Sequence, residues 1–256
     1  FKAPEAERTL MTELLSDLPD YCCLVFVYDT IEYKSDARMK KLTAAIAARG
    51  LVVPFRRQEQ GDLIDWIRRR FRALGHSIDT ADAEYLIFLC GDLMTGLASE
   101  IGKIGTYAQA ERVTRQDIDA VAIPITDAVV FQMTEALTQQ RYDRAFAVYG
   151  DLLRLRQEPI MILAVLGKHL RQLYTARLAL ELRRDSRWLM ELWGMRSAYP
   201  AEKLMQAARA HGLSWCKRAM RRCAETDLAM KSVAGSDAGT LLTGLLLELA
   251  AEGVSC

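Results

Sequence analysis

The sequence lacks the short motifs that most often identify an enzyme site. It contains no G-x-x-x-x-G-K-[ST] phosphate loop, no G-x-G-x-x-G turn and no G-x-S-x-G nucleophile elbow. Only three histidines are present, and the six cysteines form no C-x-x-C pair, so the ligand spacing of a zinc site is missing. We therefore expect no catalytic residue, no cofactor and no metal in this chain.

Long hydrophobic runs are also missing. No apolar stretch approaches the roughly 20 residues that a membrane-spanning helix requires, and the first residues contain no apolar signal segment. The 256 residues are 51% hydrophobic and 26% charged, which is ordinary for a globular protein. Scattered cysteines in apolar surroundings are typical of a reducing compartment, so we expect a cytoplasmic protein. Because the chain begins with Phe1 and not with methionine, we expect a fragment or a processed product.

The net charge of +1 hides a strong asymmetry along the chain. Between Lys168 and Lys231 there are 14 Lys and Arg against 6 Asp and Glu, a local balance of +8. A cluster at helical spacing lies within this region and consists of Lys217, Arg218, Arg221 and Arg222. Such a face could contact phosphates, or it could be an ordinary solvated helix surface, and composition alone leaves both readings open.

The first 58 residues follow a strand–helix–strand pattern. The runs 22–29 and 51–55 are short, apolar and rich in β-forming residues, and 36–50 has helical periodicity. This order predicts a parallel βαβ unit. Two parallel strands cannot form a stable sheet alone, so the remaining strands must come from elsewhere, most simply from upstream of Phe1. We predict the last part of a cut α/β domain, with an exposed edge or apolar face.

From residue 59 onward the pattern is helical. Short helices are predicted over 60–75, 79–91, 91–110 and 112–124, and the last begins with Thr114 and Asp117 as a carboxylate version of the capping box. They predict a small helical domain over 59–123. A bundle of five to seven helices follows over 124–256, and the nearly all-apolar first half of 159–182 predicts a central buried helix.

One predicted helix is unusually rich in glycine. The stretch 91–110 holds four glycines, and we expect Gly91 to end the preceding helix and a close neighbouring helix to offset the cost of the other three, about 1 kcal/mol each. Glu100 and Lys103 can pair for a few tenths of a kcal/mol, too little to be their whole purpose. The apolar face of this helix is predicted to consist of Leu93, Leu97, Ile101, Ile104 and Ala108.

The order of these parts is similar to that of AAA+ clamp-loader subunits. The stretch 61–108 resembles the lid domain of the delta subunit family of bacterial DNA polymerase III, whose pattern is matched here by Trp66, Ile67, Arg70, Ala83, Gly91, Asp92, Leu93, Glu100 and Lys103. Residues 131–178 resemble the start of the family's collar, and 224–232 resemble a late collar motif with Asp227 and Lys231.

This resemblance implies a mainly α protein in three parts. Residues 1–58 would end an AAA+-like α/β domain that lacks its N-terminal part, 59–123 would be the lid, and 124–256 the oligomerising collar. It further implies a subunit without its own ATPase that helps load a sliding clamp onto primed DNA. Other loader subunits would bind through the collar, and the clamp-binding element would lie upstream. Tyr199 is the candidate for a collar aromatic that faces DNA.

Two other interpretations remain open from the sequence. The chain could come from a catalytically active AAA+ ATPase, such as a helicase loader, whose phosphate loop lies outside it. It could also be a helical DNA-binding regulator that acts alone, although the βαβ pattern argues against this.

Overall fold

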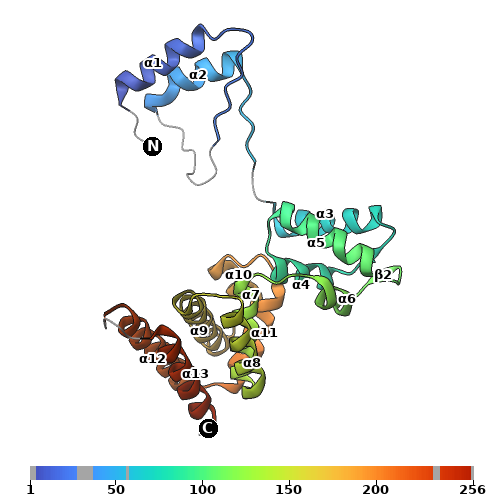
Figure 1. The fold of residues 1–256 in the computed structure, drawn as a ribbon, viewed down its shortest axis with the longest axis vertical. Helices are drawn as coiled ribbons and strands as arrows, with labels where there is room; N and C mark the ends of the chain where they lie inside the picture. Colours follow the sequence, from blue (N-terminus) through green and yellow to red (C-terminus); the bar gives the residue numbers. More distant parts are fainter. Residues whose placement is uncertain (1–3, 28–36, 56–57, 233–236, 255–256) are drawn as a thin grey trace. The chain divides into compact units, whose positions relative to one another are not determined.

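The computed structural model describes residues 4–27, 37–55, 58–232 and 237–254. The chain divides into two compact units, residues 1–57 and residues 58–256. Nearly all of the described secondary structure is helical, as the sequence predicts (Figure 1). The predicted division of residues 59–256 into a lid and a collar remains a prediction, because both parts fall within the second unit.

In the described residues, the first unit contains two helices and two extended segments. Helix α1 (Glu5–Ser16) packs against α2 (Lys40–Arg49), which follows a short 3-10 turn, η1 (Ala37–Met39). Neither 22–27 nor 51–55 forms a strand, so the predicted parallel βαβ unit is wrong for the described residues; positions 28 and 29 lie outside them. The physical reason is that a parallel strand needs paired neighbours and covered faces, and α1 and α2 supply neither.

The extended segments expose the apolar side chains that a sheet would bury. Val25 and Val27 are 78% and 75% exposed, and Leu51 and Phe55 are 84% and 94% exposed. The predicted exposed apolar face is therefore confirmed in the described part of this unit. The pattern of β-forming residues indicated extended backbone correctly and failed only on pairing, which depends on partners far away in the sequence.

The second unit begins with a small helical part. Its elements are α3 (Gln60–Ala73), β1 (Ser77–Ile78), α4 (Thr80–Cys90), α5 (Met94–Tyr107), β2 (Arg112–Val113) and α6 (Arg115–Val121). The two strands pair in parallel, with Ile78 opposite Val113. They were not predicted, because two residues are too few to show an alternating pattern. The predicted capping box of α6 is confirmed: the Thr114 backbone N–H donates to the Asp117 carboxylate at 2.8 Å.

The glycine-rich helix α5 is built differently from the prediction in two respects. Gly91 ends α4 with φ of 82°, as expected, but a side chain at Gly102 would meet nothing within 4 Å, and only Gly105 lies against a neighbour, Leu74. Close packing therefore explains one glycine and not three. Leu93 precedes α5 and is 62% exposed, whereas Leu97, Ile101 and Ile104 are buried.

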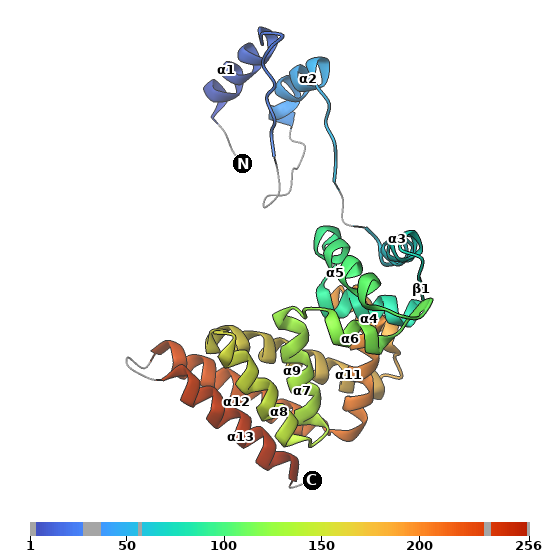
Figure 2. The ribbon, with the colours of Figure 1, turned by 45° about the vertical axis from the view of Figure 1, so that its right-hand side comes forward.

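Seven helices form the bundle in the described residues beyond 124. They are α7 (Thr126–Thr138), α8 (Tyr142–Arg154), α9 (Pro159–Glu181), α10 (Ser186–Trp193), α11 (Ala198–Ala210), α12 (Leu213–Ser232) and α13 (Ala238–Val254). Figure 2 shows α12 and α13 side by side, where they contact each other. Helix α8 buries Ala145 and Leu152 against the bundle, whereas Leu155, just after its end, is 69% exposed.

Helix α9 is the centre of the bundle, as predicted. It contacts α7, α10, α11, α12 and α13, and its buried side chains occur on every turn from Ile162 to Ala179. Helix α12 packs closely along it, since a side chain added at Gly167 would come within 3.1 Å of the Cys223 sulfur. Burial raises the pKa of Cys216 and of Cys223 to about 11, so both thiols remain protonated and act as apolar packing groups.

Candidate nucleic-acid interface and linking residues

The four basic residues singled out on α12 separate into two pairs. Arg218 forms an ion pair with Glu252 at 2.9 Å, and Arg222 pairs with Glu248 at 3.4 Å, so both are tied to α13. Lys217 and Arg221 are exposed, one turn apart, and have no ion pair among the residues that the structure describes. The two neutralised arginines therefore form one edge of α12, and the two unneutralised cations form another.

The late collar motif forms a local pair on the same helix. Lys231 donates to the Asp227 carboxylate at 2.7 Å, four residues apart, and both side chains are more than 40% exposed. An exposed pair of this kind stabilises a helix by only about 0.3–0.5 kcal/mol. Its placement near the end of α12 does not add to the exposed positive charge.

The aromatic residues of the basic region are mainly packing groups. Trp215 is 3% exposed, and Trp188 and Trp193 are partly buried against the bundle core. Stacking on nucleic-acid bases needs exposed rings, so these three tryptophans are unsuited to it.

Tyr199 lies where α11 meets the small helical part. Its ring is 5.1 Å from that of Tyr85 and 4.9 Å from that of Phe88, both on α4. Its hydroxyl accepts a hydrogen bond from Arg115 at 2.7 Å. The side chain is thus engaged within the protein, and contact with DNA remains a prediction for this residue.

Glu100 has a second partner that sequence reasoning missed. It forms the expected pair with Lys103 at 2.8 Å, and its carboxylate also accepts a hydrogen bond from the backbone N–H of Ile123 at 3.1 Å. Only 13% of the Glu100 side chain is exposed. Glu100 therefore holds the segment that connects α6 to α7, and no sequence signal could have shown it, because the two residues are 23 positions apart.

A charged network in the bundle core was also missed. Lys168 donates to one Asp127 oxygen at 2.5 Å, and the His169 Nε2–H faces the other at 2.8 Å. Burial raises the pKa of Asp127, but the hydrogen bonds from His169 and Lys168 outweigh it and lower the pKa to about 2. Burial lowers the pKa of His169, so the ring is neutral near pH 7 and links α9 to α7.

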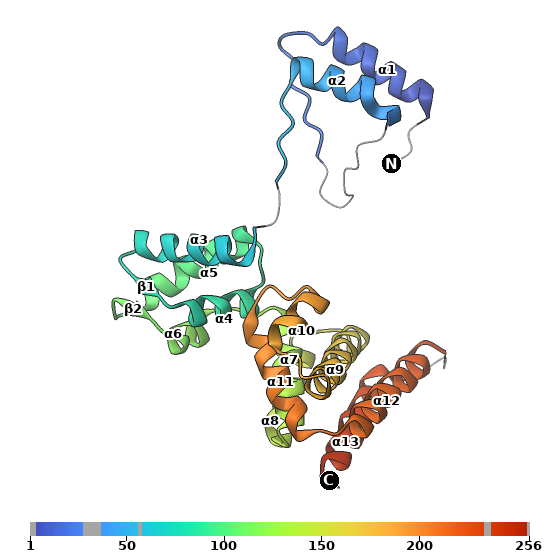
Figure 3. The ribbon, with the colours of Figure 1, turned by 180° about the vertical axis from the view of Figure 1, so that it is seen from behind.

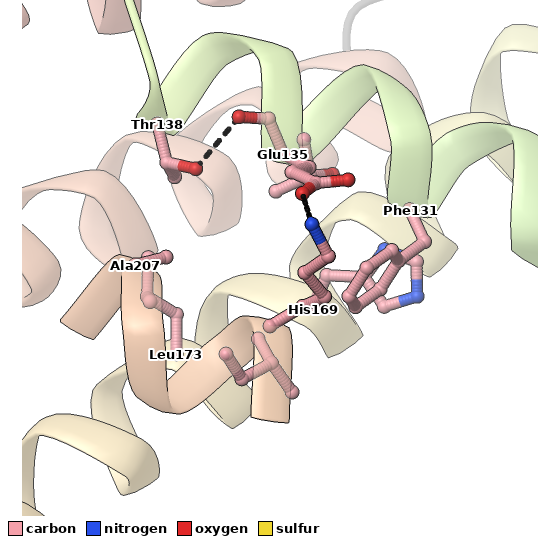
Figure 4. Close-up of a pocket in the computed structure, with 9 residues that line it drawn as sticks. Phe131, Glu135, Thr138, His169, Leu173 and Ala207 are labelled. Carbon is pink, nitrogen blue, oxygen red and sulfur yellow. Dashed lines mark hydrogen bonds and ion pairs between the residues drawn. The ribbon is translucent and has the colours of Figure 1, made fainter. Parts of the chain in front are cut away.

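The structure offers little space for a small ligand beside this network. A cavity of about 20 Å³ lies between α7, α9 and α11 and is lined in part by Phe131, Glu135, Thr138 and His169 (Figure 4). That volume holds about one water molecule. Within the described ranges no group of three His, Cys, Asp or Glu residues could hold a metal ion, and no single helix is long and apolar enough to cross a membrane.

Comparison with known proteins matches the bundle to a family. Residues 127–249 match the family described as DNA polymerase III delta subunit, C-terminal domain. This range begins at the first turn of α7 and ends within α13, so it takes in all seven helices of the bundle. The bundle is therefore similar to the C-terminal domain of the DNA polymerase III delta subunit family.

Two individual proteins extend this relationship. A curated relative, DNA polymerase III subunit delta from Bacillus subtilis (strain 168), is 24% identical over 148 residues, which are 57% of this chain and 42% of the relative. The chain thus matches less than half of that delta subunit. The solved structure of the Bacillus subtilis DNA clamp loader delta protein matches 95% of this chain and 70% of its own, with a TM-score of 0.61 and 19% identity, which shows a shared fold.

Removing the Glu100 carboxylate is expected to destabilise the protein more than removing its lysine partner. Glu100→Ala removes both the Lys103 pair and the hydrogen bond to the exposed Ile123 N–H, so the free energy of unfolding should fall by about 0.5–1.5 kcal/mol. Lys103→Ala loses only a helix-surface pair and should cost about 0.2–0.5 kcal/mol. Urea unfolding of both variants measures the difference, and equal losses would contradict the linking role of Glu100.

The Asp127 network is expected to make the bundle sensitive to acid. The folded-state pKa of about 2 is below the usual 3.8, so the stabilisation is present above pH 3.8 and disappears as the pH falls towards 2. Because Asp127 is partly exposed, we expect Asp127→Asn to cost only about 1 kcal/mol at pH 7. Unfolding followed by tryptophan fluorescence should show that the difference in unfolding free energy between the wild type and Asp127→Asn becomes smaller as the pH falls from 7 to 2. A difference that stays constant over this range would contradict a stabilising role for the ionised Asp127.

Proposed function

We propose that the chain is part of a clamp-loader delta subunit that helps load a sliding clamp onto primed DNA during chromosomal replication. The observation that carries this proposal is the match of 127–249 to the delta-subunit family. It is supported by a curated relative and a solved structure that both carry the delta name. The same comparisons do not favour the alternative, a truncated active AAA+ ATPase such as a helicase loader.

In this proposal the subunit is a scaffold in the cytoplasm and has no ATPase activity of its own. The bundle binds the other loader subunits. Exposed apolar side chains near the α8–α9 turn support such a role, because contiguous apolar surface favours protein contacts: Leu155 is 69% exposed and Met161 58% exposed. The sliding clamp is bound by a part of the protein that lies outside these residues.

The proposed DNA contact is the edge of α12 formed by Lys217 and Arg221. Two exposed cations that have no carboxylate partner in the described part of the chain retain their full attraction for phosphate, whereas Arg218 and Arg222 are already compensated by Glu252 and Glu248. Tyr199, at the start of α11, is the further candidate for DNA contact.

A reconstitution experiment tests the function as a whole. A loader assembled without its delta subunit should load clamps onto primed DNA poorly and should recover when the full-length protein is added. Recovery must not require ATP hydrolysis by the added subunit, measured on the isolated protein. If the protein joins no loader complex and restores no loading, the proposal is wrong.

The contribution of α12 to DNA binding can be measured separately in the reconstituted loader. Lys217→Gln combined with Arg221→Gln should lower the slope of log affinity against log salt by roughly 1.5, because each lost phosphate contact removes about 0.7–0.9. The matched control, Arg218→Gln with Arg222→Gln, should leave the slope nearly unchanged. Equal slopes for the first pair and the wild type would reject this surface as a DNA contact.

A further inference from the structure

The contact between α4 and α11 joins the small helical part to the bundle through a buried hydrogen bond. The Ser197 hydroxyl, at the start of α11, donates to the backbone carbonyl of Glu84 in the middle of α4 at 2.9 Å. Ser197 is 3% exposed. Separating the two helices would break this bond, and a buried hydroxyl without a partner is costly. The bond therefore favours the contact between α4 and α11. Figure 3 shows the two helices where the parts meet.

Aromatic rings fill the rest of this contact. Tyr85 and Phe88 project from α4 and lie against Tyr199 of α11. Phe88 also meets Phe131 of α7 edge to face, with centroids 5.2 Å apart. Phe88 therefore packs against both hydrophobic cores, one on each side of the contact. Rings in such edge-on arrangements restrict one another's orientation as well as burying apolar surface.

Arg115 closes the contact from the side. It comes from α6, and its guanidinium carbon lies 3.8 Å from the centroid of the Tyr85 ring and 4.7 Å from that of Tyr199. The guanidinium also donates to the Tyr199 hydroxyl at 2.7 Å, while the Tyr85 hydroxyl donates to Asp119 at 2.5 Å. Arg115 thus binds one tyrosine from each part at the same time.

A second set of bonds lies at the far end of α4. The Ile125 N–H donates to the Leu89 carbonyl at 2.9 Å, where the connecting segment enters α7. Arg196 lies 3.8 Å from the Asp92 carboxylate and donates to the Gln58 carbonyl at 2.8 Å. Helix α4 is therefore tied to the bundle near its middle and again beyond its C-terminus. Any rotation about the connecting segment would break one set or the other.

We propose that this double attachment makes the described residues 58–232 and 237–252 one rigid body, which Arg115 and Tyr199 hold together. The small helical part and the bundle then reorient together, and a displacement of the bundle is transmitted to α3 and α5 without loss. This inference goes beyond the proposed function and does not depend on it, because it concerns contacts within one chain.

The test is a distance distribution between the two parts, measured on the full chain without DNA or other subunits. Spin labels are placed at Arg69 on α3 and Arg144 on α8, both exposed, through non-natural amino acids because native cysteines are present. We expect a single narrow distribution for the wild type. Arg115→Gln combined with Tyr199→Ala should broaden or split it.

The matched control is Arg112→Gln, since Arg112 pairs with Asp79 inside the small helical part and touches nothing in the contact. Its distribution should equal that of the wild type. Circular dichroism checks that the helix content is retained; if the double variant loses helix, Arg115→Gln alone decides the result. A broad wild-type distribution, or a narrow one in a folded Arg115→Gln variant, would overturn the proposal.

Discussion

Burial of α9 is the constraint on which the rest of the second unit depends. A helix with apolar residues nearly all round is stable in water only if other helices cover most of its surface. Five helices contact α9 and bury side chains on every turn from Ile162 to Ala179, whereas Met161 in its first turn stays 58% exposed. Helix α12 runs antiparallel along α9, with Cys223 near Gly167 and Cys216 near Arg177. This orientation leaves one edge of α12 facing α13 and another facing solvent, and so separates the compensated arginines from the uncompensated cations.

The same central helix also determines where polar groups can lie. Asp127, Lys168 and His169 link α7 to α9, and the hydrogen bond to the partly exposed Asp127 makes the burial of the His169 ring tolerable. Between α11 and α4, the buried Ser197 hydroxyl is likewise satisfied, because it donates to the Glu84 backbone carbonyl. Both networks connect helices, and neither has the open geometry of a catalytic site.

Local patterns in the sequence predicted helices well and contacts poorly. The 3.6-residue periodicity placed α3 to α6 and the central helix α9, and the Thr114–Asp117 spacing identified a real capping box. The strands over 22–27 and 51–55 failed because sheet pairing requires partners that local sequence does not specify. The contacts of Glu100, Arg115 and Tyr199 could not be predicted from local sequence for the same reason, because their partners are 23 to 84 positions away.

The central claim is that the bundle is the collar of a clamp-loader delta subunit, and complex formation tests it most directly. Native mass spectrometry of this chain mixed with the remaining loader subunits should show a stoichiometric complex containing one copy of it. Polar substitutions at Leu155 and Met161 should weaken that complex and leave the helix content unchanged. A chain that stays monomeric in the mixture, while folded, would contradict the account.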